Sequence, residues 1–223
     1  MAYLVMIPIG YLLGSIPFGL IIGWISKRVD VRDYGSGKTG MTNVLRTVGV
    51  KAAALSLVLD MGKSISAVAL TRLFFDEPAA EVAAAVAALI GHNWPVYVGF
   101  RGGRGTAAGL GGLLILSPWA GLLAALVGII TIATTRWVSL GSILGTIAGV
   151  TALAVLVVIG LAPFDYVWYS VFGGLIVVVR HWDNIIRLVK GEERKIGQKV
   201  DSQLDEPVNG KEGRKGFRWP KSA

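Results

Sequence analysis

The sequence contains no cysteine and only two histidines, and charged residues make up just 16% of its 223 residues. The absence of cysteine rules out disulfides, a thiol nucleophile and thiolate metal ligands. The carboxylates are scattered along the chain, so no metal-binding cluster is visible, and we expect neither a metal nor another cofactor. A charge content this low is not typical of a soluble domain.

The sequence contains long uncharged runs, since 53% of its residues are hydrophobic. A helix needs roughly 20 apolar residues to cross a bilayer. Five runs approach that length, and two shorter ones flank a polar loop. The full spans are expected at about 3–25, 52–73, 118–135, 138–160 and 165–186, and the short ones at about 79–91 and 106–116. The runs are continuous and do not alternate, which argues against a β-barrel.

The sequence therefore predicts an all-α, polytopic helical membrane protein with about seven transmembrane helices, two of them short. If the short runs form a re-entrant pair instead, five spans remain and the sidedness is unchanged. Residues 1–199 are expected to form one transmembrane domain. Residues 200–223 are polar and charged, so they are predicted to form a disordered cytoplasmic tail.

In this topology, the basic residues are concentrated in the loops on one side of the membrane. Segments 26–51 and 92–105 and the tail are rich in Lys and Arg, whereas the connections at 74–78, 117 and 161–165 contain none, with Arg72 the exception at a span edge. Basic residues gather in cytoplasmic loops. This predicts an N-terminus outside, a C-terminus in the cytoplasm, and residence in the cell (inner) membrane. The net charge of +8 then needs no nucleic-acid partner.

The first unusual polar segment is GSGKTGMTNVLR, residues 35–46. Gly37, Lys38 and Thr39 match the end of a Walker A loop, but its opening glycine would stand where Arg32 does. The glycines also fit G-x-G-x-x-G, yet they follow an apolar helix-like segment where that fingerprint needs a strand. A glycine-rich backbone still directs several N–H groups at one point. The segment favours an anion site over a simple turn.

The second segment is GHNWPVYVGFRGGRGTAAG, residues 91–109, which lies between the two short apolar runs. Its glycines leave the backbone free around Arg101 and Arg104, and the guanidinium fork suits phosphate. Irregular backbone at membrane depth is tolerated only where it is buried or lines a cavity. A structural and a catalytic role for His92 are about equally expected.

The third segment is VVVRHWDNIIRLVKGEERKIGQK, residues 177–199. On one continuous helix, Arg180, Asn184 and Arg187 would share a face. A basic belt at the membrane edge explains the arginines but not Asn184, which is therefore predicted to be a site residue. Asp60 and Lys63, inside the second span, are expected to form a structural ion pair.

Taken together, these segments resemble the acyl-phosphate-dependent glycerol-3-phosphate acyltransferases of bacteria. The resemblance rests on four motifs in order: LLGSIPFG at 12–19, GSGxxGxTNxxR at 35–46, GHNWPVYVGFRGGRGTA at 91–107 and RHxxNIxRLxxGxExKxGxK at 180–199. It includes Pro17, which should kink the first span. The chain departs from the family pattern at Lys38, usually Asn, at Met41, usually Ala, and at Arg104, usually Lys.

The resemblance implies transfer of a fatty acyl group from acyl phosphate to the 1-hydroxyl of glycerol 3-phosphate, with membrane lipids as surroundings. It implies that substrate binding or catalysis uses Ser36, Arg46, His92, Arg104 and Asn184. Phosphate binding is expected from Gly35, Gly37, Gly40, Thr42, Asn43, Arg101, Gly102, Gly103, Gly105, Arg180 and Lys195. Either His92 or the departing phosphate could accept the hydroxyl proton. Oligomeric state and acyl chain preference are left open.

Two other functions compete with this interpretation. The H-x-x-x-x-D pattern of acyl-CoA-dependent enzymes is absent, because Tyr97 and Ile186 stand where Asp would follow the two histidines. A phosphate or organophosphate transporter would also use basic loops, but it would need a site near mid-bilayer that both faces reach. The candidate residues gather at the inner edge, which favours the enzyme.

Overall fold

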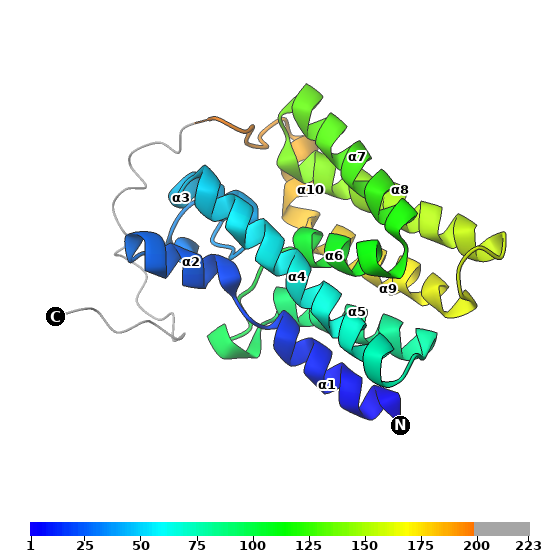
Figure 1. The fold of residues 1–223 in the computed structure, drawn as a ribbon. Coiled ribbons are helices and arrows are strands. Elements are labelled where there is room, and N and C mark those ends of the chain that lie inside the picture. The colour runs from blue at the N-terminus through cyan, green and yellow to red at the C-terminus, as the bar shows by residue number, and fades with distance from the viewer. Residues whose placement is uncertain (199–223) are drawn as a thin grey trace.

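The computed structural model describes residues 1–198, and this part of the chain forms helices and contains no strand (Figure 1). The α-helices are α1 Ala2–Gly14, α2 Phe18–Lys27, α3 Met41–Thr47, α4 Val50–Phe74, α5 Pro78–Asn93, α6 Thr106–Leu116, α7 Pro118–Thr135, α8 Val138–Val158, α9 Val167–Arg180 and α10 Trp182–Val189. Three single turns of 3-10 helix join them: η1 Val31–Asp33, η2 Val96–Val98 and η3 Phe164–Tyr166. The predicted tail at 200–223 lies outside the described residues.

The all-helical membrane fold predicted from the sequence is confirmed, but two of the five expected full spans are not single helices. The first run breaks at Ser15–Pro17, as the proline predicted, because Pro17 has no N–H to continue the helix. Its two halves together form a predominantly apolar segment of 26 residues, Ala2–Lys27. The last run, expected at 165–186, divides at His181 into α9 and α10. Within residues 1–198, four segments are long and apolar enough to cross a membrane.

The two short apolar runs both form regular helices. α5 has 16 residues and α6 has 11. At 1.5 Å per residue, α6 spans roughly 16 Å, about half of a hydrocarbon core. It packs against α4 on one side and α7 on the other. Residues of α6 from Thr106 to Leu113 border the larger of the two cavities described below.

Small residues bring the longer helices close together. A side chain on Gly14 of α1 would overlap the Ala88 carbonyl of α5. A Cβ on Gly145 of α8 would lie 2.6 Å from the Ala124 carbonyl oxygen of α7. Close backbone contact through small residues is the usual way in which helices associate inside a membrane, where no hydrophobic effect drives them together.

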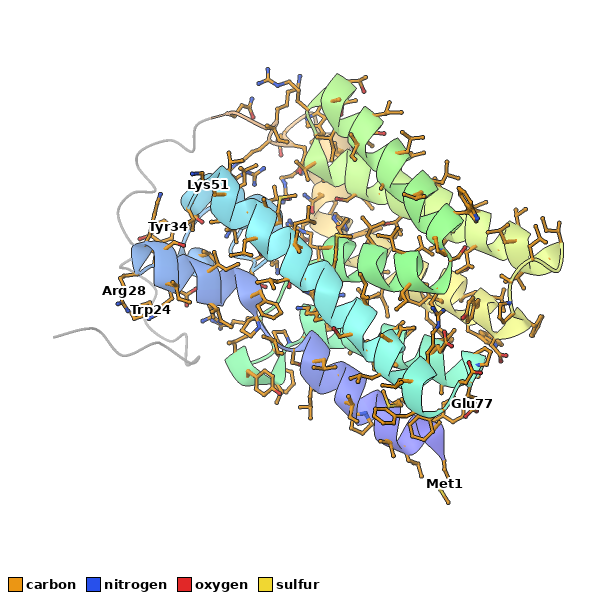
Figure 2. All side chains as sticks on the ribbon, viewed as in Figure 1. Met1, Trp24, Arg28, Tyr34, Lys51 and Glu77 are labelled. Atoms are coloured by element: carbon orange, nitrogen blue, oxygen red, sulfur yellow. The ribbon has the colours of Figure 1, made fainter. Side chains whose placement is uncertain are left out.

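The segments predicted to be cytoplasmic gather at one end of the molecule. Figure 2 shows Arg28, Tyr34 and Lys51 at that end and Met1 and Glu77 at the other. Arg72, the basic residue at the far end, pairs with Glu81 of α5 at 2.8 Å. The Tyr166 hydroxyl of η3 donates to the same carboxylate at 2.7 Å. This basic residue, which the sequence left unexplained, is therefore neutralised by a buried carboxylate of the helix bundle.

Candidate functional site

The loop between η1 and α3 is folded around one buried side chain, Asn43. Its Oδ1 accepts the Ser36 N–H at 2.9 Å, and its Nδ2 donates to the Val31 and Lys38 carbonyls at 2.6 and 2.9 Å. Gly35 has a φ of 58°, and any side chain there would collide with Asn43 Oδ1. Asn43 therefore holds the loop in shape, and its amide is already used by backbone groups.

The GGRG loop, residues 102–105, is held in a similar way. The Gly103 N–H donates to the His92 carbonyl at 3.1 Å, and Arg180 Nη2 donates to the Gly103 carbonyl at 2.8 Å. The Arg180 guanidinium also lies over the Trp94 ring, 4.9 Å from its centroid. Gly105, with a φ of 86°, then starts α6. These contacts fix the backbone that carries Arg104.

His92 belongs to a buried polar cluster beneath that loop. The predicted ion pair is present, with Lys63 Nζ 2.9 Å from Asp60 Oδ1 and both side chains 2% exposed. His92 Nδ1 lies 3.4 Å from the same oxygen, and its Nε2 is packed against Gly103. Lys63 also donates to the Ile16 carbonyl at the break between α1 and α2, at 3.0 Å. The cluster ties the loop to α4 and to the first span.

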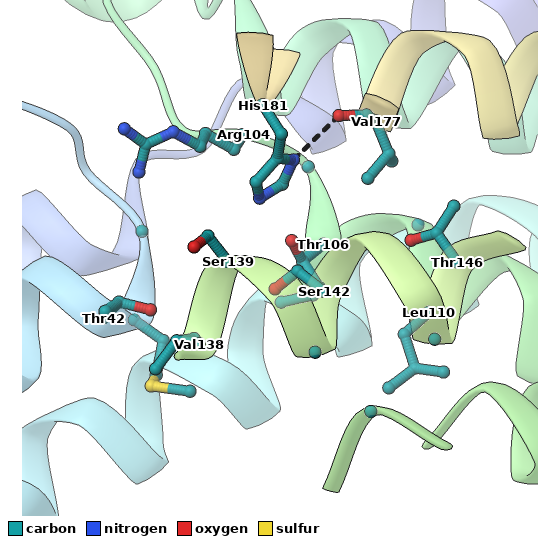
Figure 3. A pocket seen from close by; sticks show the side chains of 18 of the residues that line it. Thr42, Arg104, Thr106, Leu110, Val138, Ser139, Ser142, Thr146, Val177 and His181 are labelled. Carbon is teal, nitrogen blue, oxygen red and sulfur yellow. Dashed lines mark hydrogen bonds between the residues drawn. The ribbon is translucent and has the colours of Figure 1, made fainter. Parts of the chain in front are cut away.

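The third polar segment folds differently from the prediction of one shared helix face, which was wrong. The chain turns at His181, so Arg180 reaches the GGRG loop while Asn184 and Arg187 lie on α10. His181 Nδ1 lies 2.8 Å from the Val177 carbonyl oxygen (Figure 3). A carbonyl only accepts, so Nδ1 carries the hydrogen, and Nε2 is left as an acceptor.

Glu193, just after α10, gathers three donors. Its carboxylate accepts from Ser139 Oγ at 2.7 Å, Asn184 Nδ2 at 2.7 Å and Arg187 Nε at 2.8 Å. Burial raises the pKa of Glu193, but these hydrogen bonds outweigh burial and leave the pKa below its ordinary value. An ionised Glu193 therefore fastens the chain after α10 to α8.

Two cavities meet among these segments, one of about 280 Å³ and one of about 220 Å³. Six residues border both: Ser36, Lys38, Arg46, Arg104, Asn184 and Glu193. The larger cavity continues as an apolar groove between α6, α7, α8 and α9. Figure 3 shows Thr42 and Arg104 on one side of this cavity and Leu110 and Thr146 on the other, with Ser139 and Ser142 between them.

The cavities reach ten of the residues predicted to bind substrate or act in catalysis: Ser36, Arg46, His92, Arg104, Asn184, Gly35, Gly40, Thr42, Asn43 and Gly105. They do not reach Gly37, Arg101, Gly102, Gly103, Arg180 or Lys195. Arg101 is exposed, and Lys195 Nζ lies 5.2 Å from the Trp137 ring centroid. Gly102, Gly103 and Arg180 contribute to the shape of the loop.

Several residues that border the larger cavity were not predicted as site residues from the sequence, among them Lys38, Ser139, Ser142, His181 and Glu193. His181 and Glu193 belong to the same motif as Asn184, at residues 180–199, so the motif could have indicated them as site residues. Lys38 was noted only as a departure from a pattern. Nothing in the sequence marked Ser139 and Ser142 as site residues, because small polar residues are common in apolar helices.

Fold and site together define a class: an integral membrane protein with a cation-lined chamber that opens into an apolar groove. The family model described as glycerol-3-phosphate acyltransferase matches residues 4–191. The chain belongs to this family.

Relatives of known name and structure agree. A glycerol-3-phosphate acyltransferase 3 of Dehalococcoides mccartyi is 43% identical over 208 residues, covering 88% of this chain and 96% of the relative. A glycerol-3-phosphate acyltransferase of Desulforamulus reducens is 44% identical over 196 residues, covering 87% and 96%. The crystal structure of PlsY, described as an integral membrane glycerol 3-phosphate acyltransferase in its glycerol 3-phosphate form, superposes with a TM-score of 0.80 at 35% identity, covering 88% and 96%.

Proposed function

We propose that this chain transfers a fatty acyl group from acyl phosphate to the 1-hydroxyl of glycerol 3-phosphate. The products are 1-acylglycerol 3-phosphate (lysophosphatidic acid) and inorganic phosphate, and the site faces the cytoplasm. One observation carries the proposal: the larger cavity joins a cationic chamber to an apolar groove. A substrate with a phosphate at one end and a fatty chain at the other matches that division.

The chamber has the charge to hold phosphate groups. The smaller cavity is bordered by five cations, Lys38, Arg46, Arg104, Arg187 and Arg194, and by two carboxylates, Asp183 and Glu193. The buried Nε of Arg104 donates no hydrogen bond to any of residues 1–198. Burial, and next to it Arg187, lower the pKa of Arg104 from its ordinary value. A buried donor without a partner is costly, so an anion in the chamber would stabilise it.

The groove has the length of an acyl chain. Its lining on α8 runs from Val138 to Val150, twelve residues on, which at 1.5 Å each is roughly 18 Å. A fatty chain spans one leaflet, about half of the ~30 Å hydrocarbon core. Leu113 and Tyr169 border the groove and also belong to the hydrophobic core, so the groove closes where the core begins.

The chemistry asks mainly for positioning and charge. The 1-hydroxyl oxygen attacks the acyl carbonyl, the carbonyl–phosphate bond breaks, and the phosphate leaves with the bonding electrons. Arg46 and Arg104 neutralise the phosphates, and together with the Ser36 hydroxyl they donate hydrogen bonds to the oxyanion that develops. A phosphate oxygen of the donor takes the hydroxyl proton, so no strong base is needed.

We assign different roles to the two histidines, His92 and His181. His92 borders the larger cavity, but its Nδ1 faces Asp60 and its Nε2 is packed against Gly103, so we assign it to shaping the loop and not to acting as the base. His181 offers its Nε2 as an acceptor near Asn184, where both can orient the glycerol hydroxyls. We therefore assign the role in the reaction to His181, and not to His92, which the sequence suggested.

The orientation in the membrane rests on charge. The basic segments 26–51 and 92–105 and the α10 end lie together at the end that holds both cavities. Glycerol 3-phosphate would enter the smaller, polar cavity from water. Acyl phosphate would occupy the larger one.

A reconstituted assay tests the proposal. Purified protein in detergent is mixed with hexadecanoyl phosphate and labelled glycerol 3-phosphate, and acylated product and inorganic phosphate are measured. We expect equal amounts of both, and no product when hexadecanoyl-CoA replaces the acyl phosphate. Uptake of labelled glycerol 3-phosphate into proteoliposomes without turnover would instead support the organophosphate transporter. Folded protein that gives neither result contradicts both.

A further inference from the structure

Lys38 occupies a place in the site that the mechanism above does not use. It borders both cavities, on the rim where they meet, and it is half-buried. Its own carbonyl is held by Asn43 Nδ2 at 2.9 Å, so the backbone at this point is fixed. Within residues 1–198, its ammonium group makes no hydrogen bond and no ion pair, although Lys27 and Lys63, at 3.0 Å each, both donate to carbonyls.

The surroundings make an uncompensated ammonium unfavourable. Burial lowers the pKa of Lys38, and so do Arg180 at the end of α9 and Arg104 in the GGRG loop, while Asp183 of α10 opposes them. The other charged residues around the smaller cavity are Arg46 of α3, Arg187 of α10, and Arg194 and Glu193 after it. Glu193 already accepts three hydrogen bonds. A group of negative charge is what this part of the chamber lacks.

We propose that Lys38 is a further phosphate ligand of the site, whose ammonium group contacts a substrate phosphate held between the two cavities. The inference rests on the proposed function. The motif at 35–46 usually has Asn at this position, so the contact would be particular to chains that carry Lys here. A lysine suits the position because its three donors sit on a flexible stem and can follow a phosphate, whereas the arginines hold it by a rigid fork.

The first experiment removes the positive charge of Lys38 and compares the result with a variant that keeps the charge and with one that removes the charge of another lysine. Lys38→Met is compared with Lys38→Arg and with Lys51→Met, which removes an exposed lysine at the start of α4, at the same end of the molecule (Figure 2). Loss of one charged hydrogen bond is expected to raise a Michaelis constant about ten- to hundredfold. We expect this for Lys38→Met with kcat little changed, and no effect for Lys51→Met. Measuring the constants for glycerol 3-phosphate and acyl phosphate separately shows whose phosphate is held.

The second experiment uses pH. As pH rises through the lowered pKa of Lys38, the ammonium group loses its proton and its attraction for phosphate is lost. The ratio of kcat/KM between the wild-type chain and Lys38→Met should therefore fall toward one at alkaline pH, because kcat/KM reports the free enzyme. The same ratio for Lys38→Arg should stay high over that range, since Arg keeps its charge. A structural role for Lys38 would not produce this difference.

Inorganic phosphate serves as an independent probe. Its binding to the full chain in detergent, followed by calorimetry, is expected to weaken about tenfold or more in Lys38→Met and not in Lys51→Met. This readout needs no turnover, so it tests the ligand even if the proposed reaction proves wrong. Equal Michaelis constants and equal phosphate binding in Lys38→Met and wild type overturn the inference. So does a folded Lys38→Arg variant without turnover, which would indicate that Lys38 acts as a neutral base.

Discussion

Charged residues are paired at one end of this protein and include an excess of cations at the other. At the end with Met1, Arg72, Glu81 and Tyr166 form a closed group in which the arginine has its counter-ion and the carboxylate accepts two donors. At the other end, cations outnumber carboxylates around a cavity, and the Arg104 Nε has no partner among the described residues. A charge that is paired across two helices holds them together. Cations in excess of the carboxylates around them leave charge for the anionic ligand proposed above.

The largest expected effect tests the unpaired end. Arg104→Ala should lower kcat/KM by an amount worth roughly 2–5 kcal/mol, because it removes a partly buried cation from a phosphate contact. Thermal unfolding in detergent should change little. Arg101→Ala is the matched control, since Arg101 is three residues away, exposed and outside both cavities. Equal losses in the two variants would contradict the placement of the chamber.

The next effect tests the paired end. Glu81→Gln removes the carboxylate that Arg72 and Tyr166 share, which we expect to reduce the free energy of unfolding by about 2 kcal/mol. The value stays moderate because the Arg72 side chain is 38% exposed and water can reach it. The unfolding midpoint should fall while KM for both substrates is unchanged. The exposed Asp76, at the same end, gives the control variant Asp76→Asn. A change in KM without a change in the midpoint would show that the two ends are not separate.

The smallest effect concerns the groove that leads away from the chamber. Val150→Phe adds bulk at the closed end of the groove, so kcat/KM for hexadecanoyl phosphate should fall relative to decanoyl phosphate by about tenfold, or ~1.4 kcal/mol. Val155→Phe, on the same helix but 51% exposed, should leave the ratio unchanged. The ratio is measured with both donors in competition. Equal ratios in the two variants would mean that the chain does not reach this depth.

Much of the helical framework could be predicted from the sequence. The bounds of α6 and α7 coincide with the predicted apolar runs, and Pro17 indicated the break between α1 and α2. The ion pair between Asp60 and Lys63 followed from their spacing, because intramembrane charges three residues apart on a helix can reach each other. The division of the last run at His181 could not be predicted, since its residues read as one helical pattern.

The sequence by itself determined that this chain crosses a membrane as helices, and that its basic, glycine-rich segments lie at the same end. Both depend on local composition: apolar length and the charge of the loops. Only the tertiary structure decided which residues of those segments meet. It placed His181 and Lys38 at the cavities, held His92 against Asp60 at the wall of the larger one and left Arg101 outside both, because side-chain direction depends on how distant helices pack and where each one breaks.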